Sequence, residues 1–259
     1  MGKNQILTLA SALLLVLCLY FGFEYKPDKI RNLEKSRSTN LEVTGIENLL
    51  LEVRENLTLE EMKILEDLRS EINKSSDSLK LEATKAYASK WYELGHPTIS
   101  AYYAEEVAKA DKKSDSWAIA GTSYIIGMKN ASSEKEKEFA FKRAVIAFEN
   151  ASSLEPNNLN HQINLALVYV EKPLANDPMK GIMMLRDLNT KNPANVSVMV
   201  QLARLAIKTS QWDRAEQRLK EALELEPANK QANCLMAEVM IEKGETISAK
   251  AYQELCNSN

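Results

Sequence analysis

The chain has 259 residues, 45% of them hydrophobic and 27% charged, and its formal net charge at pH 7 is −3. This composition suits a folded protein with a sizeable core and excludes low-complexity and collagen-like chains. Basic and acidic residues are interspersed, which argues against a nucleic-acid-binding protein, because such proteins gather lysine and arginine on one surface. Glycine and proline are scarce, with 8 and 7 occurrences, so long helices are favoured over many turn-linked strands.

An apolar segment stands near the start of the sequence. Residues 6–23 carry no charged side chain, and a helix of that length can cross a hydrocarbon core of about 30 Å. Large aromatic residues stand where a signal peptidase needs small ones. We therefore predict an uncleaved single-pass transmembrane anchor over residues 1–25, with residues 5–24 in the membrane.

The side of the membrane on which the body lies depends on the flanking charges. Lys3 precedes the apolar segment, whereas Lys26, Lys29, Arg31, Lys35 and Arg37 follow it. The positive-inside rule thus predicts a cell inner membrane protein with a cytoplasmic body; the alternative is a periplasmic body, since large domains cross largely regardless of charge. Cys234 and Cys256 suggest buried free thiols, hence a reducing compartment, with a single disulfide as the alternative.

Two segments separate the anchor from the rest of the chain. Residues 26–40 are charged and end in small polar residues, which is typical of a juxtamembrane linker. Residues 41–78 hold two amphipathic stretches, and the second opens at Thr58-Leu59-Glu60-Glu61, a capping-box pattern. We predict a helical hairpin over 41–78, whose helices at 41–74 are a candidate surface for homo-oligomerisation.

Internal periodicity is strongest in the last third of the chain. Pro193 and Pro227 lie thirty-four residues apart and close similar helical segments, and Ala215 and Ala222 precede the second proline at fixed spacing. At these residues the chain resembles the tetratricopeptide repeat (TPR) family. The same pattern recurs upstream, with a first helix marked by Trp117, Gly121 and Tyr124 and a second marked by Ala144, Phe148, Ala151 and Pro156. Extra residues between these two helices are expected to form a long loop at 127–138.

The resemblance implies an all-α fold, a right-handed α-solenoid of about five helix pairs over residues 79–259. Its units fall at about 82–113, 114–158, 159–195, 196–229 and 230–259, of which the first and last are weaker copies. Alanine and glycine let the two helices of a unit approach closely, while aromatic and leucine side chains fill the space between units.

Catalytic patterns are missing from the sequence. His96 and His161 fall in different repeats, and neither has a metal-ligand partner one turn away. Nucleophile-elbow, P-loop and dinucleotide-binding motifs do not occur. We therefore expect no enzyme activity, no catalytic residue, no metal and no cofactor.

The family's partner groove is formed by fixed positions of the first helices. Here those positions select Asn160, Ile163, Leu167, Val200, Arg204, Ile207, Lys208 and Glu238. The resemblance thus implies an apolar groove with a basic flank, which suits an amphipathic helix or an extended peptide with acidic flanks, unless a loop or neighbouring helix covers it. The sequence predicts a non-catalytic, membrane-tethered adaptor or scaffold for a protein or peptide partner. The alternative is a periplasmic chaperone-like or envelope-assembly factor that uses the same groove.

Overall fold

The computed structural model describes residues 45–257, so the predicted anchor and linker lie outside the described residues. The chain divides into two compact units, residues 1–48 and 49–259, and all the described helices belong to the second unit except the start of α3. Among residues 45–257, no helix is both long enough and apolar enough to cross a membrane.

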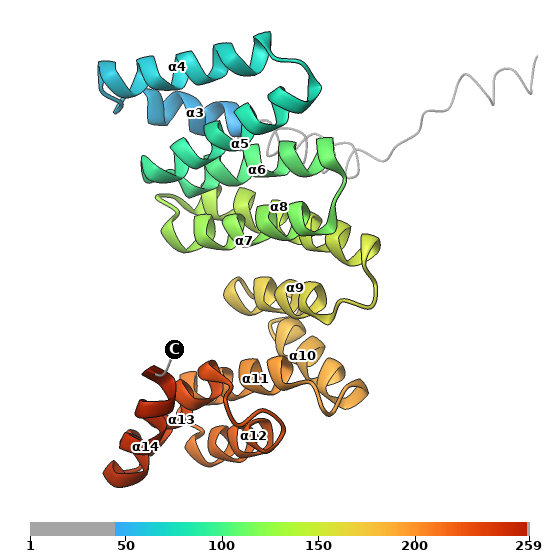
Figure 1. Cartoon of the computed structure of the whole chain (residues 1–259), viewed down its shortest axis with the longest axis vertical. Coiled ribbons are helices and arrows are strands. Elements are labelled where there is room, and N and C mark those ends of the chain that lie inside the picture. Colours follow the sequence, from blue (N-terminus) through green and yellow to red (C-terminus); the bar gives the residue numbers. More distant parts are fainter. Residues whose placement is uncertain (1–44, 258–259) are drawn as a thin grey trace, which may run out of the picture. The chain divides into compact units, whose positions relative to one another are not determined.

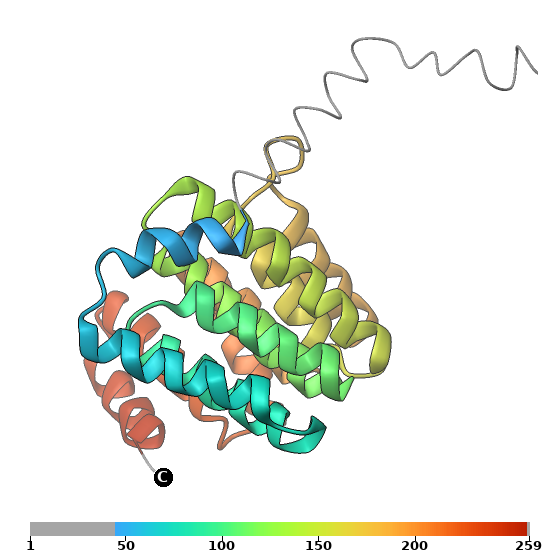
Figure 2. The ribbon, with the colours of Figure 1, turned by 90° about the horizontal axis from the view of Figure 1, so that it is seen from above.

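Twelve helices make up the described part of the chain. They are α3 (Ile46–Arg54), α4 (Leu59–Lys74), α5 (Asp77–Glu93), α6 (Pro97–Asp111), α7 (Ser114–Asn130), α8 (Glu134–Leu154), α9 (Leu159–Glu171), α10 (Lys180–Lys191), α11 (Val196–Lys208), α12 (Trp212–Leu225), α13 (Lys230–Glu242) and α14 (Thr246–Asn257). From α4 onward each helix packs against the next one in the chain, and α7 also touches α9 as α11 touches α13 (Figure 1). Within residues 49–257, the view from above shows successive helix pairs covering one another (Figure 2). The predicted all-helical, TPR-like solenoid is confirmed.

Residues 55–58 connect α3 to α4, and α4 opens with the predicted capping box. The Thr58 amide donates to Glu61 Oε2 at 2.8 Å, and the Glu61 amide donates to Thr58 Oγ1 at 3.2 Å. These two bonds satisfy backbone groups that the first turn of a helix would otherwise leave free. They therefore fix where α4 begins.

The insertion between the first two consensus helices extends helices instead of forming a loop. Only residues 131–133 connect α7 to α8, so the predicted loop at 127–138 is wrong. The Ser133 hydroxyl caps α8 by accepting from the Glu136 amide at 3.2 Å. The glutamates and lysines that follow Ser133 are good helix formers, which explains why the helix starts there.

The small residues of the repeat signature lie where helices cross. Ala144, Ala151, Ala215 and Ala222 are all fully buried. A Cβ atom added to Gly121 would lie 2.7 Å from the Phe148 ring, so α7 and α8 can approach this closely only with glycine there. Of the remaining signature residues, Tyr124 and Phe148 are fully buried, Trp117 is half-buried, and Pro156, Pro193 and Pro227 are exposed in the turns after α8, α10 and α12.

A buried carboxylate joins three helices of the array. Glu105 on α6 is 1% exposed and accepts from the Tyr124 hydroxyl at 2.9 Å and from Arg143 Nε at 2.8 Å. A second nitrogen of Arg143 donates to its other oxygen, and Lys109 Nζ lies 3.0 Å from that oxygen. Burial raises the pKa of the Tyr124 hydroxyl well above its ordinary value, so this group stays a donor.

The two C-terminal helices are joined covalently. Cys234 on α13 and Cys256 on α14 form a disulfide, with their Cα atoms 4.8 Å apart. The free-thiol interpretation of these residues is therefore wrong. Helix packing brings together two cysteines that lie 22 residues apart in the chain, which spacing alone does not reveal.

Candidate functional site

The two histidines, His96 and His161, are packed against neighbouring side chains and do not lie in a metal site among the described residues. His96 precedes α6, and its ring packs edge to face against Trp91 with ring centroids 5.8 Å apart. Burial lowers the pKa of His96, against the opposing effect of Glu136 and Glu61. His161 is buried in α9, with its Nε2 atom 3.4 Å from Glu155 Oε2. Among residues 45–257, no group of three or more histidine, cysteine or acidic side chains could hold a metal ion.

The predicted groove at 160–208 is only partly an open surface. Ile163 is 4% exposed and packs in the core shared by α9, α10 and α11, while Val200 is 1% exposed and packs in the core of α11 to α14. These two residues therefore belong to the core and not to a groove. The physical reason is that α9 and α11 each contact helices on more than one side, so little of their circumference stays open.

The other predicted groove residues keep some contact with solvent. Asn160, Arg204, Lys208 and Glu238 are exposed, while Leu167 and Ile207 are half-buried against the two cores. Arg204 and Lys208 stand one turn apart on α11, and neither is in an ion pair within the described residues. Of the predicted groove residues, Arg204 and Lys208 form an exposed basic edge on α11.

A better-formed concavity lies between α5, α6 and α7. This α5–α7 groove has a volume of about 500 Å³, with Ala88, Ala104 and Val107 among its lining residues. Two large apolar side chains on its lining are open to solvent, Tyr92 at 52% exposure and Ile119 at 61%. The groove therefore presents apolar surface to the outside.

Three of the charged residues that line the α5–α7 groove have partners within the chain, whereas the Lys113 ammonium group is in no ion pair among residues 45–257. Asp111 accepts from the Ser116 hydroxyl at 2.5 Å and from the Lys113 amide at 3.1 Å. Lys85 and Glu93 are in ion pairs along α5 with Glu82 and Lys90. A ligand here would gain mainly by covering apolar side chains, as when one face of an amphipathic helix docks.

The sequence contained a signal for this groove that the repeat consensus hides. Ile119 lies between the consensus residues Trp117 and Gly121, and it points away from the core that they help to form. A large apolar residue on the solvent-exposed face of a helix indicates a surface that a ligand could cover. Tyr92 shows the same pattern on α5.

No protein-family model and no curated protein sequence matches the chain. Similar folds are found among solved structures. MamA residues 41 to the end from Desulfovibrio magneticus RS-1 has a TM-score of 0.40 and 15% identity, covering 68% of this chain and 93% of that one. MamA AMB-1 has a TM-score of 0.36 and 19% identity, covering 70% and 91%. YrrB, described as a TPR protein with an unusual peptide-binding site, has a TM-score of 0.36 and 14% identity, covering 70% and 91%. At these values the likeness carries no information about partner or function.

Proposed function

We propose that this protein is a non-catalytic adaptor, held at a membrane by the predicted helix at 5–24, that binds a partner protein through the α5–α7 groove. The observation that carries the proposal is the pair of exposed apolar side chains, Tyr92 and Ile119, on a groove of about 500 Å³. Apolar surface gathered in a concavity is typical of a site that another polypeptide covers.

Charge introduced into the groove tests this proposal. We expect Tyr92→Glu combined with Ile119→Glu to abolish capture of the partner from detergent-solubilised membranes, because a buried carboxylate without a counter-ion opposes docking. Leu225→Glu with Ile241→Glu is the matched control, since these residues are also half-exposed and apolar but lie on α12 and α13. Capture of the same proteins by the groove variant and by the wild type would refute the assignment.

The basic edge gives a second, independent arm of the test. Arg204→Glu with Lys208→Glu reverses two exposed charges on α11 without touching the core. If an acidic flank of the partner reaches this edge, the double variant weakens capture, and the weakening diminishes at high salt, where exposed charges are screened. An unchanged capture would remove α11 from the binding surface.

We propose further that the repeat domain faces the oxidising side of the membrane. The Cys234–Cys256 disulfide supports this, because disulfides persist in the periplasm and are rare in the cytosol. The positive-inside rule favours the opposite side, but it weakens for large domains. An oxidising location favours the alternative function, a chaperone-like or envelope-assembly factor. A C-terminal alkaline phosphatase fusion should be active; an inactive fusion alongside an active cytoplasmic fluorescent reporter would refute the assignment.

A further inference from the structure

A trough with a volume of about 490 Å³ runs along α4, bounded by the end of α3 and by α5. Its lining residues on α4 extend from Met62 to Asn73 at spacings of three and four, so they share one face of the helix. At 1.5 Å per residue this face is about 16 Å long. The capping box at Thr58 fixes the start of α4 and hence the mouth of the trough.

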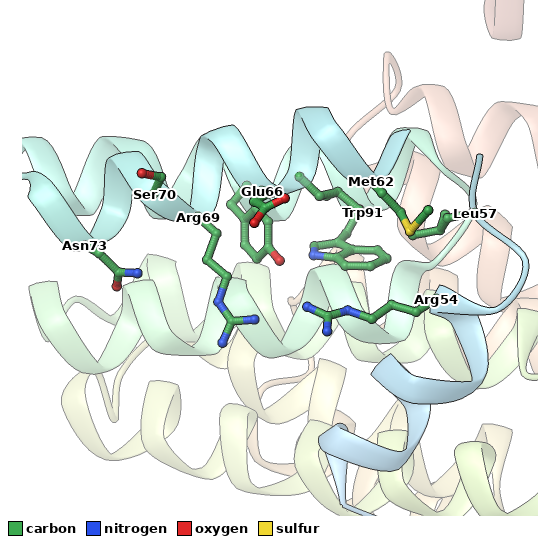
Figure 3. Close-up of a pocket in the computed structure, with 10 residues that line it drawn as sticks. Arg54, Leu57, Met62, Glu66, Arg69, Ser70, Asn73 and Trp91 are labelled. Carbon is green, nitrogen blue, oxygen red and sulfur yellow. The ribbon is translucent and has the colours of Figure 1, made fainter. Parts of the chain in front are cut away.

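Among residues 45–257, two arginines face the trough without a counter-ion. Arg54 closes α3 and Arg69 lies in the middle of α4, and Figure 3 shows their guanidinium groups directed into the same space. Both side chains are exposed, and within residues 45–257 neither is in an ion pair or a side-chain hydrogen bond. Glu66 is the acidic residue on the lining, so the trough keeps an excess of positive charge.

A buried donor on the wall of the trough also lacks a partner. Trp91 is 1% exposed, and its indole nitrogen makes no hydrogen bond to any group in residues 45–257. Tyr87 and His96 pack edge to face against the ring, with centroids 6.0 Å and 5.8 Å away, and restrict its rotation. In Figure 3 the indole is drawn next to the Arg54 side chain, with Arg69 further along α4, and both arginines are donors only and cannot accept its hydrogen.

One end of the trough is apolar. Leu57, Met62 and Leu65 occupy the end of the trough close to the start of α4. A ligand must therefore bring an acceptor with negative charge to the arginines and the indole, and apolar surface to this end. A carboxylate matches the planar guanidinium fork, and it can accept the indole hydrogen as well.

We propose that this trough binds an acidic side chain of a partner polypeptide together with the apolar side chain next to it. The carboxylate lies between Arg54 and Arg69 and accepts from Trp91, while the apolar side chain packs on Leu57 and Met62. The site is separate from the α5–α7 groove. It therefore stands or fails independently of the function proposed above.

The indole N–H resonance of Trp91 reports directly on this site. The experiment uses the full chain in detergent micelles, with the signals of its 3 tryptophans assigned through Trp91→Phe. The probes are acetyl-Leu-Glu-Leu-amide, the matched acetyl-Leu-Gln-Leu-amide, and inorganic phosphate. We expect the glutamate peptide to shift the Trp91 resonance in a saturable manner, and Arg54→Ala with Arg69→Ala to weaken that binding about tenfold or more.

A control variant and control ligands show whether the trough recognises a carboxylate on a polypeptide. Lys63→Ala, an exposed change on α4 away from the trough, should leave the titration unchanged. Equal binding of the glutamine peptide, or full affinity in the double arginine variant, would show that no carboxylate is recognised. A shift produced equally by phosphate alone would show a small-anion or lipid-headgroup site and would overturn the assignment to a polypeptide. Absence of any Trp91 shift with the glutamate peptide at saturating concentration would overturn it as well.

Discussion

Glu105 shows how a single buried charge organises this array. It bonds to Tyr124 on α7 and to Arg143 on α8, so its removal leaves an arginine and a hydroxyl without their partner. We expect Glu105→Ala to lower the free energy of unfolding by about 3 kcal/mol, because breaking a buried pair costs far more than losing an exposed one. Urea unfolding measures this difference.

The neighbouring residue Glu106 supplies the control for Glu105. Its side chain is 40% exposed, and its ion pair with Lys109 is solvent-accessible, so Glu106→Ala should cost about 0.5 kcal/mol or less. If both variants lose the same stability, the network around Glu105 contributes no more than a surface pair. That result would contradict the role given to the buried carboxylate.

His96 gives stability a dependence on pH. Burial holds its pKa below the ordinary value of 6.5, so the folded protein favours the neutral ring. The contribution of this residue is therefore complete above about pH 6.5 and is lost as pH falls through the lower, folded pKa. We expect the free energy of unfolding to decline from pH 7.5 to pH 5.5, and to decline less in His96→Gln. An equal decline in the variant would assign the effect to other groups.

Individual residues differed in how far the sequence could place them. Ala144 and Ala222 were predictable, because a short side chain at a helix crossing has one physical reason. Ile163 and Val200 were not, because a family position gives the register of a residue along its helix but not how many neighbouring helices cover it. The cysteine pair depended on the distance between two helices, which the chain spacing of 22 does not fix.

At the scale of elements, the last helix depends on its disulfide. Ala249 is the fully buried residue of α14, so apolar packing holds this helix weakly, and the Cys234–Cys256 bond closes a loop of 22 residues. We expect Cys256→Ala to lower the free energy of unfolding by about 3 kcal/mol, with amide exchange accelerated most in α14. Dithiothreitol should destabilise the wild type by a similar amount and leave the variant unchanged. Slow exchange in α14 of the variant would show that packing alone retains the helix.

Other elements show where periodicity is a sufficient guide. The start of α4 could be predicted from residues 58–61 alone, because a capping box involves only neighbouring residues in the sequence. The conformation of the insertion between α7 and α8 could not be predicted in this way, because a repeat pattern shows that extra residues are present but not whether they lengthen the helices or the loop. The trough along α4 was also beyond the sequence, since it requires the mutual placement of α3, α4 and α5.

At the scale of the whole array, helix α9 contributes side chains to two neighbouring hydrophobic cores and so links them. Its Val168 and Tyr169 belong to the core of α6 to α9, and its Ile163 and Ala166 belong to the core shared with α10 and α11. In a repeat protein, stability is a sum of unit and interface terms, so weakening one interface can separate the transitions of the two halves. The packing of α9 on α10 is therefore the place to test cooperativity.

Gly181 provides that test. A Cβ atom there would lie 2.5 Å from the Ala166 carbonyl oxygen and 2.7 Å from the Val170 amide, and backbone atoms cannot swing aside as a side chain can. We expect Gly181→Ala to cost about 1–3 kcal/mol through overpacking, and to divide unfolding into two phases detected by amide exchange in α7 and α12. Met183→Ala, a 52% exposed position on the same helix, should leave a single transition. A uniform shift of both halves in Gly181→Ala would mean that the coupling between them does not depend on this interface.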